Sequence, residues 1–262
     1  MKSGDGFLKS RSGQATIFII LAIILVSSIA LFLVFRGDVR ISISGGNQGN
    51  TNVFLDSCLK DKIKDVVETI SLQGGDIENP LSVNFQFDNE EFRNVSYLCY
   101  TQSDYSFCVN QKPALKSHIE SEIKKEIQED VDSCFEEMAT SFRNQGFDVN
   151  PSDGDFSVSI IQDKIFVDID KSITATRNEE TTTQSSFRTG IVSNLGNLID
   201  VAKEVINKEA TECDFEQVGY EAFYPEYEID KTSAPDSSII YTIKYRDTGE
   251  KFRFAVRNCV GL

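Results

Sequence analysis

The sequence predicts an α+β fold, in which a single N-terminal transmembrane helix is followed by a disulfide-stapled α+β extracytoplasmic domain. Three observations support this prediction. Residues 15–35 form an uncharged apolar run, all six cysteines follow that run, and the remaining chain alternates between helical and strand-like hydrophobic patterns. The predicted organisation is a basic cytoplasmic leader (1–13), a transmembrane helix (14–36), a polar linker (37–51) and an extracytoplasmic domain (52–262).

The apolar run contains no charged residue, proline or glycine. At about 1.5 Å per residue, a helix over residues 15–35 spans roughly 30 Å, the hydrocarbon thickness of a bilayer. A core helix would normally show a polar face, and a secretory signal would end its apolar run at a small-x-small cleavage site. Neither pattern is present, so we expect a retained single-pass helix in the cell membrane, with the lipid bilayer as a partner.

The cysteines indicate which side of the membrane holds the domain. An even number of cysteines confined to one side is typical of disulfides in an oxidising compartment. Lys2, Lys9 and Arg11 before the helix outnumber Arg36 and Arg40 after it, which is a weak positive-inside bias. We therefore expect the N-terminus inside and the bulk of the chain outside.

The spacing of the cysteines predicts three pairs. Cys58 and Cys134 occupy the same register of two long helical patterns that must pack together. Cys99 and Cys108 are close enough in sequence to bridge a hairpin. Cys213 and Cys259 then remain as the third pair.

Hydrophobic periodicity predicts the elements of the domain. Apolar residues at helical spacing predict three helices, and alternating residues predict strands, while the Ser/Thr-rich residues 172–186 suit an exposed strand or loop. The expected helices cover 53–72, 113–145 and 188–208, and the expected strands cover 81–87, 94–101, a hairpin over 156–170 and a hairpin over 239–256.

Two segments of the domain look alike. Asp-Ser-Cys at residues 56–58 and again at 132–134 opens a helical pattern, and each pattern closes at Gln-Gly and runs into a strand. Duplication explains the match, with sub-units at 52–151 and 152–262 packed about a pseudo-twofold axis. Convergent helix-stop chemistry explains it equally well, because glycine commonly ends helices.

The residues at the entrance of the apolar run, Lys9 to Phe18 (KSRSGQATIF), resemble the class III signal of archaeal type IV pilin-like proteins. The resemblance implies processing between Gly13 and Gln14. Many type IV pilins carry Glu at the fifth mature position, where this chain has Phe18. That difference and the bulky apolar run favour a tethered protein over a bulk filament subunit.

A second resemblance covers most of the domain. The QATIF motif, DSCL and LQGG at residues 56–75, and FRFAVRN at residues 252–258 are similar to a family of uncharacterised surface proteins of small-genome archaea. The family implies a membrane anchor and an outer α+β domain, with no known activity.

Composition and motifs argue against several functional classes. The 26 basic and 41 acidic side chains give a net charge of −15, which would repel a phosphate backbone, so we expect no nucleic-acid partner. The chain has one histidine, His118, and no GxSxG, HExxH or P-loop motif. We expect no catalytic residue, no metal ligand and no cofactor, and therefore no enzyme.

We expect a membrane-anchored cell-surface structural or adhesion protein, whose partners are the bilayer and either itself or other surface proteins. One alternative is a tethered binding or receptor domain. Another is an extracellular hydrolase that uses an acid pair such as Asp168 and Asp170, which lie two residues apart on a predicted strand. Residues 150–155 form either a polar turn or a weak calcium loop, and Asn94 begins a glycosylation acceptor pattern.

Overall fold

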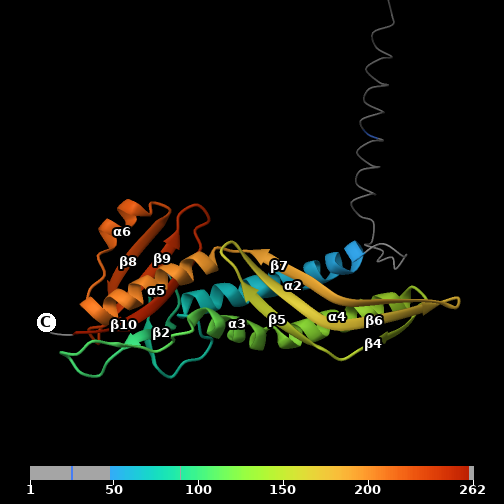
Figure 1. The fold of residues 1–262 in the computed structure, drawn as a ribbon, viewed down its shortest axis with the longest axis horizontal. Helices are drawn as coiled ribbons and strands as arrows, with labels where there is room; N and C mark the ends of the chain where they lie inside the picture. Colours follow the sequence, from blue (N-terminus) through green and yellow to red (C-terminus); the bar gives the residue numbers. More distant parts are fainter. Residues whose placement is uncertain (1–24, 26–47, 89, 260–262) are drawn as a thin grey trace, which may run out of the picture. The chain divides into compact units, whose positions relative to one another are not determined.

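The structure is a computed structural model that describes residue 25, residues 48–88 and residues 90–259. The chain divides into two units, Met1–Ser42 and Ile43–Leu262, and the described part of the second unit is the α+β domain (Figure 1). Apart from Leu25 and residues 48–51, the predicted leader, transmembrane helix and linker lie outside the described residues. Among the described helices, none is both long and apolar enough to cross a membrane.

The described residues form two sheets. The first has six strands, β1 (Ser82–Phe85), β2 (Arg93–Tyr100), β3 (Val109–Asn110), β8 (Tyr227–Ser233), β9 (Ile239–Tyr245) and β10 (Lys251–Arg257). Their order is β1–β2–β10–β9–β8, and β3 also pairs with β2. The β2–β10 pair is parallel, whereas the other pairs are antiparallel. Segments more than 130 residues apart in sequence therefore meet at the centre of this sheet, which has consequences for the site described below.

The second sheet has four strands, β4 (Asp148–Pro151), β5 (Asp155–Ile160), β6 (Lys164–Arg177) and β7 (Glu180–Val192). The long strand β6 pairs with β4, β5 and β7, always antiparallel. The predicted hairpin at 156–170 is present, and the Ser/Thr-rich residues after it extend β6 and form β7. Thr174 faces Thr183, and Thr176 faces Thr181, with 3.0 Å between hydroxyl oxygens in each pair.

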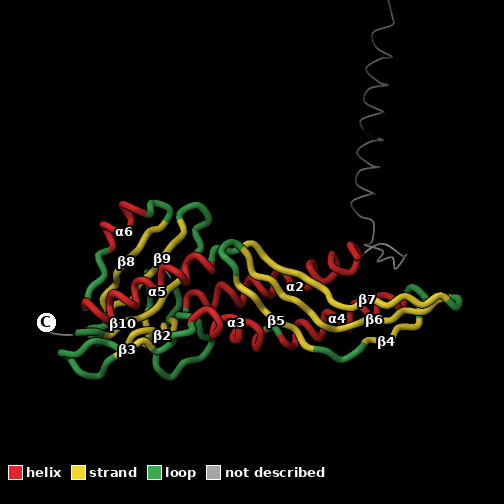
Figure 2. Tube along the Cα trace, in the orientation of Figure 1, coloured by secondary structure: helices red, strands yellow, loops and turns green. Residues whose placement is uncertain are grey.

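Five helices lie among the described residues: α2 (Gln48–Leu72), α3 (Leu115–Glu126), α4 (Gln128–Asn144), α5 (Leu195–Glu212) and α6 (Gln217–Phe223). Helix α2 packs against both sheets, contacting β7 and β10, and also against α3 and α4, while α5 packs on β9 and β10 (Figure 2). Leu55, Leu59 and Ile63 of α2 are fully buried. Helix α2 thus lies between elements of both sheets.

Two of the helices differ from the expected ones in their bounds. The first four residues of helix α2, 48–51, fall in the predicted linker, and the Thr51 hydroxyl holds this extension by donating to Gln184 of β7 at 2.8 Å. The single helix expected over 113–145 is divided at Ile127 into α3 and α4. The division is slight, since Ile127 is fully buried and still donates to Ile123 and accepts from Val131.

The helix expected from residue 188 was predicted wrongly at its start, because residues 188–192 belong to strand β7. Phe187, Thr189 and Ile191 are buried at alternate positions, a strand period that the helical pattern obscured. Gly190 permits the close pairing with β6, where an added Cβ would lie 2.3 Å from the Ile165 carbonyl oxygen. Helix α5 therefore starts only at Leu195.

The two similar segments do end alike. Gly74 and Gly146 follow α2 and α4 in left-handed conformations, with φ of 78° and 86°. The strands that come next, however, belong to different sheets, because β1 pairs with β2 and β4 pairs with β6. The second sheet therefore contains residues from both sides of the boundary predicted at residue 151, because β4 pairs with β6. Duplication of the two segments stays a prediction.

Candidate functional site

All six cysteines are described and all are paired. The disulfides are Cys58–Cys134, Cys99–Cys108 and Cys213–Cys259, the same pairs that the sequence predicts, with Cα–Cα distances of 6.0, 5.3 and 5.9 Å. The first joins α2 to α4. The predicted processing residues, Gly13 and Gln14, lie outside the described residues.

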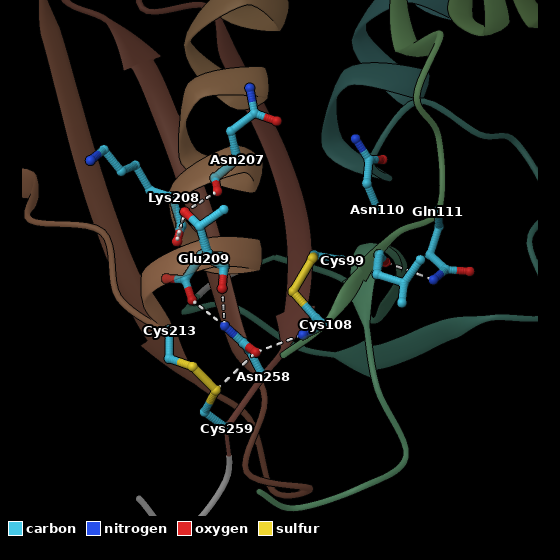
Figure 3. The surroundings of a disulfide bond; sticks show 12 residues. Cys99, Cys108, Asn110, Gln111, Asn207, Lys208, Glu209, Cys213, Asn258 and Cys259 are labelled. Atoms are coloured by element: carbon cyan, nitrogen blue, oxygen red, sulfur yellow. Dashed lines mark hydrogen bonds between the residues drawn. A yellow bond between two sulfur atoms is a disulfide. The ribbon is translucent and has the colours of Figure 1, made fainter. Parts of the chain in front are cut away.

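The other two disulfides lie close to Asn258, just after β10 (Figure 3). The Asn258 side-chain oxygen accepts from the Cys108 amide at 2.8 Å, and its nitrogen donates to the Glu209 carbonyl and, at 3.3 Å, to the Glu209 carboxylate. Glu209 also accepts from the Tyr241 hydroxyl and is fully buried. Burial and the Glu209 carboxylate together raise the pKa of Tyr241, so its hydroxyl remains a donor. This network ties α5 to the end of β10.

Residues 101–108 form a loop, closed at its base by the Cys99–Cys108 disulfide, that we call the disulfide loop. The Arg257 guanidinium donates to the Thr101 carbonyl at 2.6 Å and to the Asp104 carboxylate at 2.8 Å. The Cys259 amide donates to the Ser106 carbonyl at 3.3 Å. The loop is therefore held at several points, although its aromatic residues Tyr105 and Phe107 are 72% and 56% exposed.

A surface groove of about 450 Å³ lies where the disulfide loop leaves the first sheet. Its lining comes from four separate segments, and the residues are Pro80, Leu81, Ser82, Tyr97, Tyr100, Gln102, Asp236 and Arg257. The groove borders a buried cluster that includes Val95 and Ile240, against which Leu81 and Tyr100 also pack. The rings of Tyr97 and Tyr100 meet edge to face, with centroids 5.0 Å apart.

The polar groups of this groove are fixed by the protein itself. The Asp236 carboxylate accepts from the Tyr97 hydroxyl, and from the backbone amide and hydroxyl of Ser238 at 3.2 and 2.6 Å. Burial opposes ionisation, but these hydrogen bonds hold the pKa of Asp236 below its ordinary value. Burial, assisted by Asp236, raises the pKa of Tyr97 to about 12. At neutral pH the groove therefore presents an ionised Asp236 and a protonated Tyr97.

A second polar cluster joins the end of α2 to the start of α3. The buried carboxylate of Asp76 lies 2.5 Å from the Lys112 ammonium and 2.7 Å from Nε2 of His118. Burial opposes its ionisation, but the hydrogen bonds from His118 and Lys112 lower the pKa of Asp76 to about 2. His118, the one histidine of the sequence, thus lies beside an ion pair. Its contacts fasten the turn after α2.

Two of the acidic residues considered for catalysis or calcium, Asp168 and Asp155, have basic partners. Asp168 accepts from Arg188 at 2.5 Å, and Asp155 accepts from Lys124 at 2.8 Å. Asp170 pairs in register with Asp155 across β5 and β6. Within residues 48–88 and 90–259, no group of three or more His, Cys, Asp or Glu side chains is placed to hold a metal ion.

The groove residues were not found by sequence reasoning. They are ordinary side chains at strand ends and turns, and only the parallel pairing of β2 with β10 brings Tyr97 and Arg257 together. One available signal was the run Tyr97-Leu-Cys-Tyr-Thr-Gln102, which places two tyrosines and an amide beside a predicted disulfide.

Comparisons with known proteins leave the chain without an assigned relative. No protein-family model, no curated protein and no solved structure matches it.

Proposed function

We propose that this chain is a membrane-anchored cell-surface protein with a structural or adhesive role, tethered by residues 15–35 and carrying its α+β domain outside the cell. The observation that carries the proposal is the complete pairing of six cysteines, all of which follow the apolar run. Protein disulfides persist in oxidising compartments and are rare in the cytosol of most cells.

The surface of the domain supports a recognition role. Tyr105 and Phe107 are exposed on the disulfide loop, whose fixed position lowers the entropy that a partner would otherwise have to overcome. Aromatic side chains are enriched among the residues that dominate binding at protein surfaces. An adhesive contact through this loop is consistent with the proposal.

A second candidate function, a tethered binding domain, is favoured by the groove beside the same loop. Its volume of about 450 Å³ falls within the range of roughly 300–1,000 Å³ that small-molecule sites occupy. The two candidates share the anchor and the topology and differ only in what the domain contacts.

Surface labelling of intact cells tests the shared topology within a single chain. A membrane-impermeant amine reagent should modify the exposed Lys60 and Lys64 of α2 but should leave Lys2 and Lys9 unlabelled until the membrane is permeabilised. Peptide mass spectrometry identifies the modified lysines. Labelling of Lys2 and Lys9 with protection of Lys60 and Lys64 would reverse the topology and reject the proposal.

If the leader has been removed, peptides containing Lys2 and Lys9 are absent from the sample. Labelling of Lys60 and Lys64 on intact cells then still supports an outside domain. A cytosolic protein labelled only after permeabilisation provides the control for membrane integrity.

A further inference from the structure

We infer that the groove beside the disulfide loop binds a neutral saccharide. The inference deepens the proposed function and rests on it, because a domain outside the cell would meet the saccharides of cell surfaces. It depends on three properties of the groove: a tyrosine ring in its wall, polar groups without an unpaired cation, and a geometry that is fixed before a ligand arrives.

The aromatic wall comes from strand β2. Tyr100 is partly exposed at the end of the strand, and its ring is supported from the side by the buried Tyr97. Leu81 and Pro80 also line the groove beside this ring. A sugar ring has an apolar face of C–H groups between its hydroxyls, and a rigid tyrosine ring offers a matching apolar surface with a polar tip.

The polar lining suits an uncharged ligand rich in hydroxyls. Asp236 can accept hydrogen bonds, Arg257 can donate them, and the exposed Gln102 amide can do both. The positive charge of Arg257 is already paired with Asp104 at 2.8 Å, and Asp236 adds a negative charge to the groove. A phosphate or sulfate would therefore meet no free cation among these lining residues.

The groove is arranged before a ligand binds. Tyr97 and Ser238 fix Asp236, and the Thr101 carbonyl and Asp104 hold the guanidinium of Arg257. The Cys99–Cys108 disulfide constrains the loop that carries Gln102. Because these side chains lose little freedom on binding, modest contacts can produce measurable affinity.

The test uses the full-length chain, solubilised in a polyoxyethylene detergent that carries no sugar headgroup. The probe is a multivalent glycan array with neutral hexose and N-acetylhexosamine oligosaccharides, together with sialylated and sulfated ones. Multivalent display raises weak affinities to detectable levels. We expect the protein to be retained on one or more neutral oligosaccharides. It should not be retained on the sulfated or sialylated forms of the same oligosaccharides.

Two substitutions connect any binding to the groove. Gln102→Ala and Tyr100→Ala are each expected to weaken binding by about tenfold or more, which corresponds to about 1.4 kcal/mol. Tyr100→Phe keeps the ring and should retain most of the binding. Phe223→Ala provides the matched control, because Phe223 is 83% exposed and precedes strand β8, whereas Asp236 follows it. Circular dichroism verifies that each variant is folded.

Three results would overturn the saccharide inference. They are absence of binding to every neutral glycan, binding only to acidic glycans, and binding that Gln102→Ala and Tyr100→Ala leave unchanged. If Lys60 and Lys64 are labelled on intact cells in the same preparation, the proposed topology survives that result. A domain found on the cytosolic side would reject the proposed function independently of the array.

Discussion

Replacing Cys58 and Cys134 together by alanine is expected to lower the free energy of unfolding by about 4 kcal/mol. The pair closes a loop with a sequence separation of 76 residues, and a cross-link stabilises chiefly by restricting the unfolded chain. The Cys99–Cys108 pair has a separation of only 9 residues, so its replacement should cost about 3 kcal/mol in the same treatment. The larger loss should therefore follow removal of the helix–helix disulfide.

Urea unfolding of the full-length protein in detergent, followed by far-ultraviolet circular dichroism, measures both differences; the chain has no tryptophan to report by fluorescence. Adding a reductant to the unmodified protein provides the control, since it should lower the unfolding midpoint below that of either double variant. An unfolding midpoint insensitive to reductant would contradict the stabilising role of the disulfides.

Glu90→Gln is expected to destabilise the domain by about 3 kcal/mol, because it leaves a buried guanidinium without its counter-ion. Arg253 is only 2% exposed and donates to the two oxygens of Glu90 at 2.9 and 3.2 Å. Its guanidinium also stacks 3.6 Å from the ring centre of Phe87. This ion pair attaches the segment after β1 to the centre of strand β10.

A second variant separates the charge effect from lost packing. The double variant Glu90→Gln, Arg253→Met removes the uncompensated charge of the Arg253 guanidinium and should recover part of the lost stability in the same urea experiment.

The hydrogen bond from Arg253 lowers the pKa of Glu90 despite the opposing effect of burial. The contribution of Glu90 is therefore complete above its unfolded-state pKa and is lost as the pH falls through the lower folded-state pKa. A Glu90→Gln variant as stable as the parent chain at neutral pH would refute this account.

The elements with long, regular hydrophobic patterns could be predicted from the sequence. The spacing of Leu55, Leu59 and Ile63 in α2 reflects one continuous buried face, whereas β9 and β10 are buried on both faces along most of their length. The pairing of Cys58 with Cys134 could be predicted because the two cysteines occupy matching positions in two helical patterns that must pack together. The α+β class and the presence of disulfides are confirmed on this basis.

Elements whose form depends on distant partners could not be predicted in the same way. Strand β7 is mostly polar along its exposed half and is held by pairing with β6 and by packing against α2. The short helix α6 has no buried residue and begins where the Glu216 carboxylate accepts from the amides of Val218 and Gly219. A seven-residue segment of this kind shows no periodicity that a sequence pattern could detect.

The groove illustrates the same limit at the level of a site. Arg257 lies 156 positions from Thr101, whose carbonyl accepts its hydrogen bond, and the two are brought together by the parallel pairing of β2 with β10. No local motif specifies that pairing. The chemistry of the groove therefore became evident only from the sheet topology.

The proposed function requires the domain to lie in an oxidising compartment, where its six cysteines form three pairs. Native membranes can be dissolved in denaturant that contains a thiol-alkylating reagent, and the peptides mapped by mass spectrometry before and after reduction. We expect six unalkylated cysteines and three cross-linked peptide pairs, Cys58–Cys134, Cys99–Cys108 and Cys213–Cys259. Alkylation of all six cysteines before reduction would show a reducing environment and contradict the proposed function.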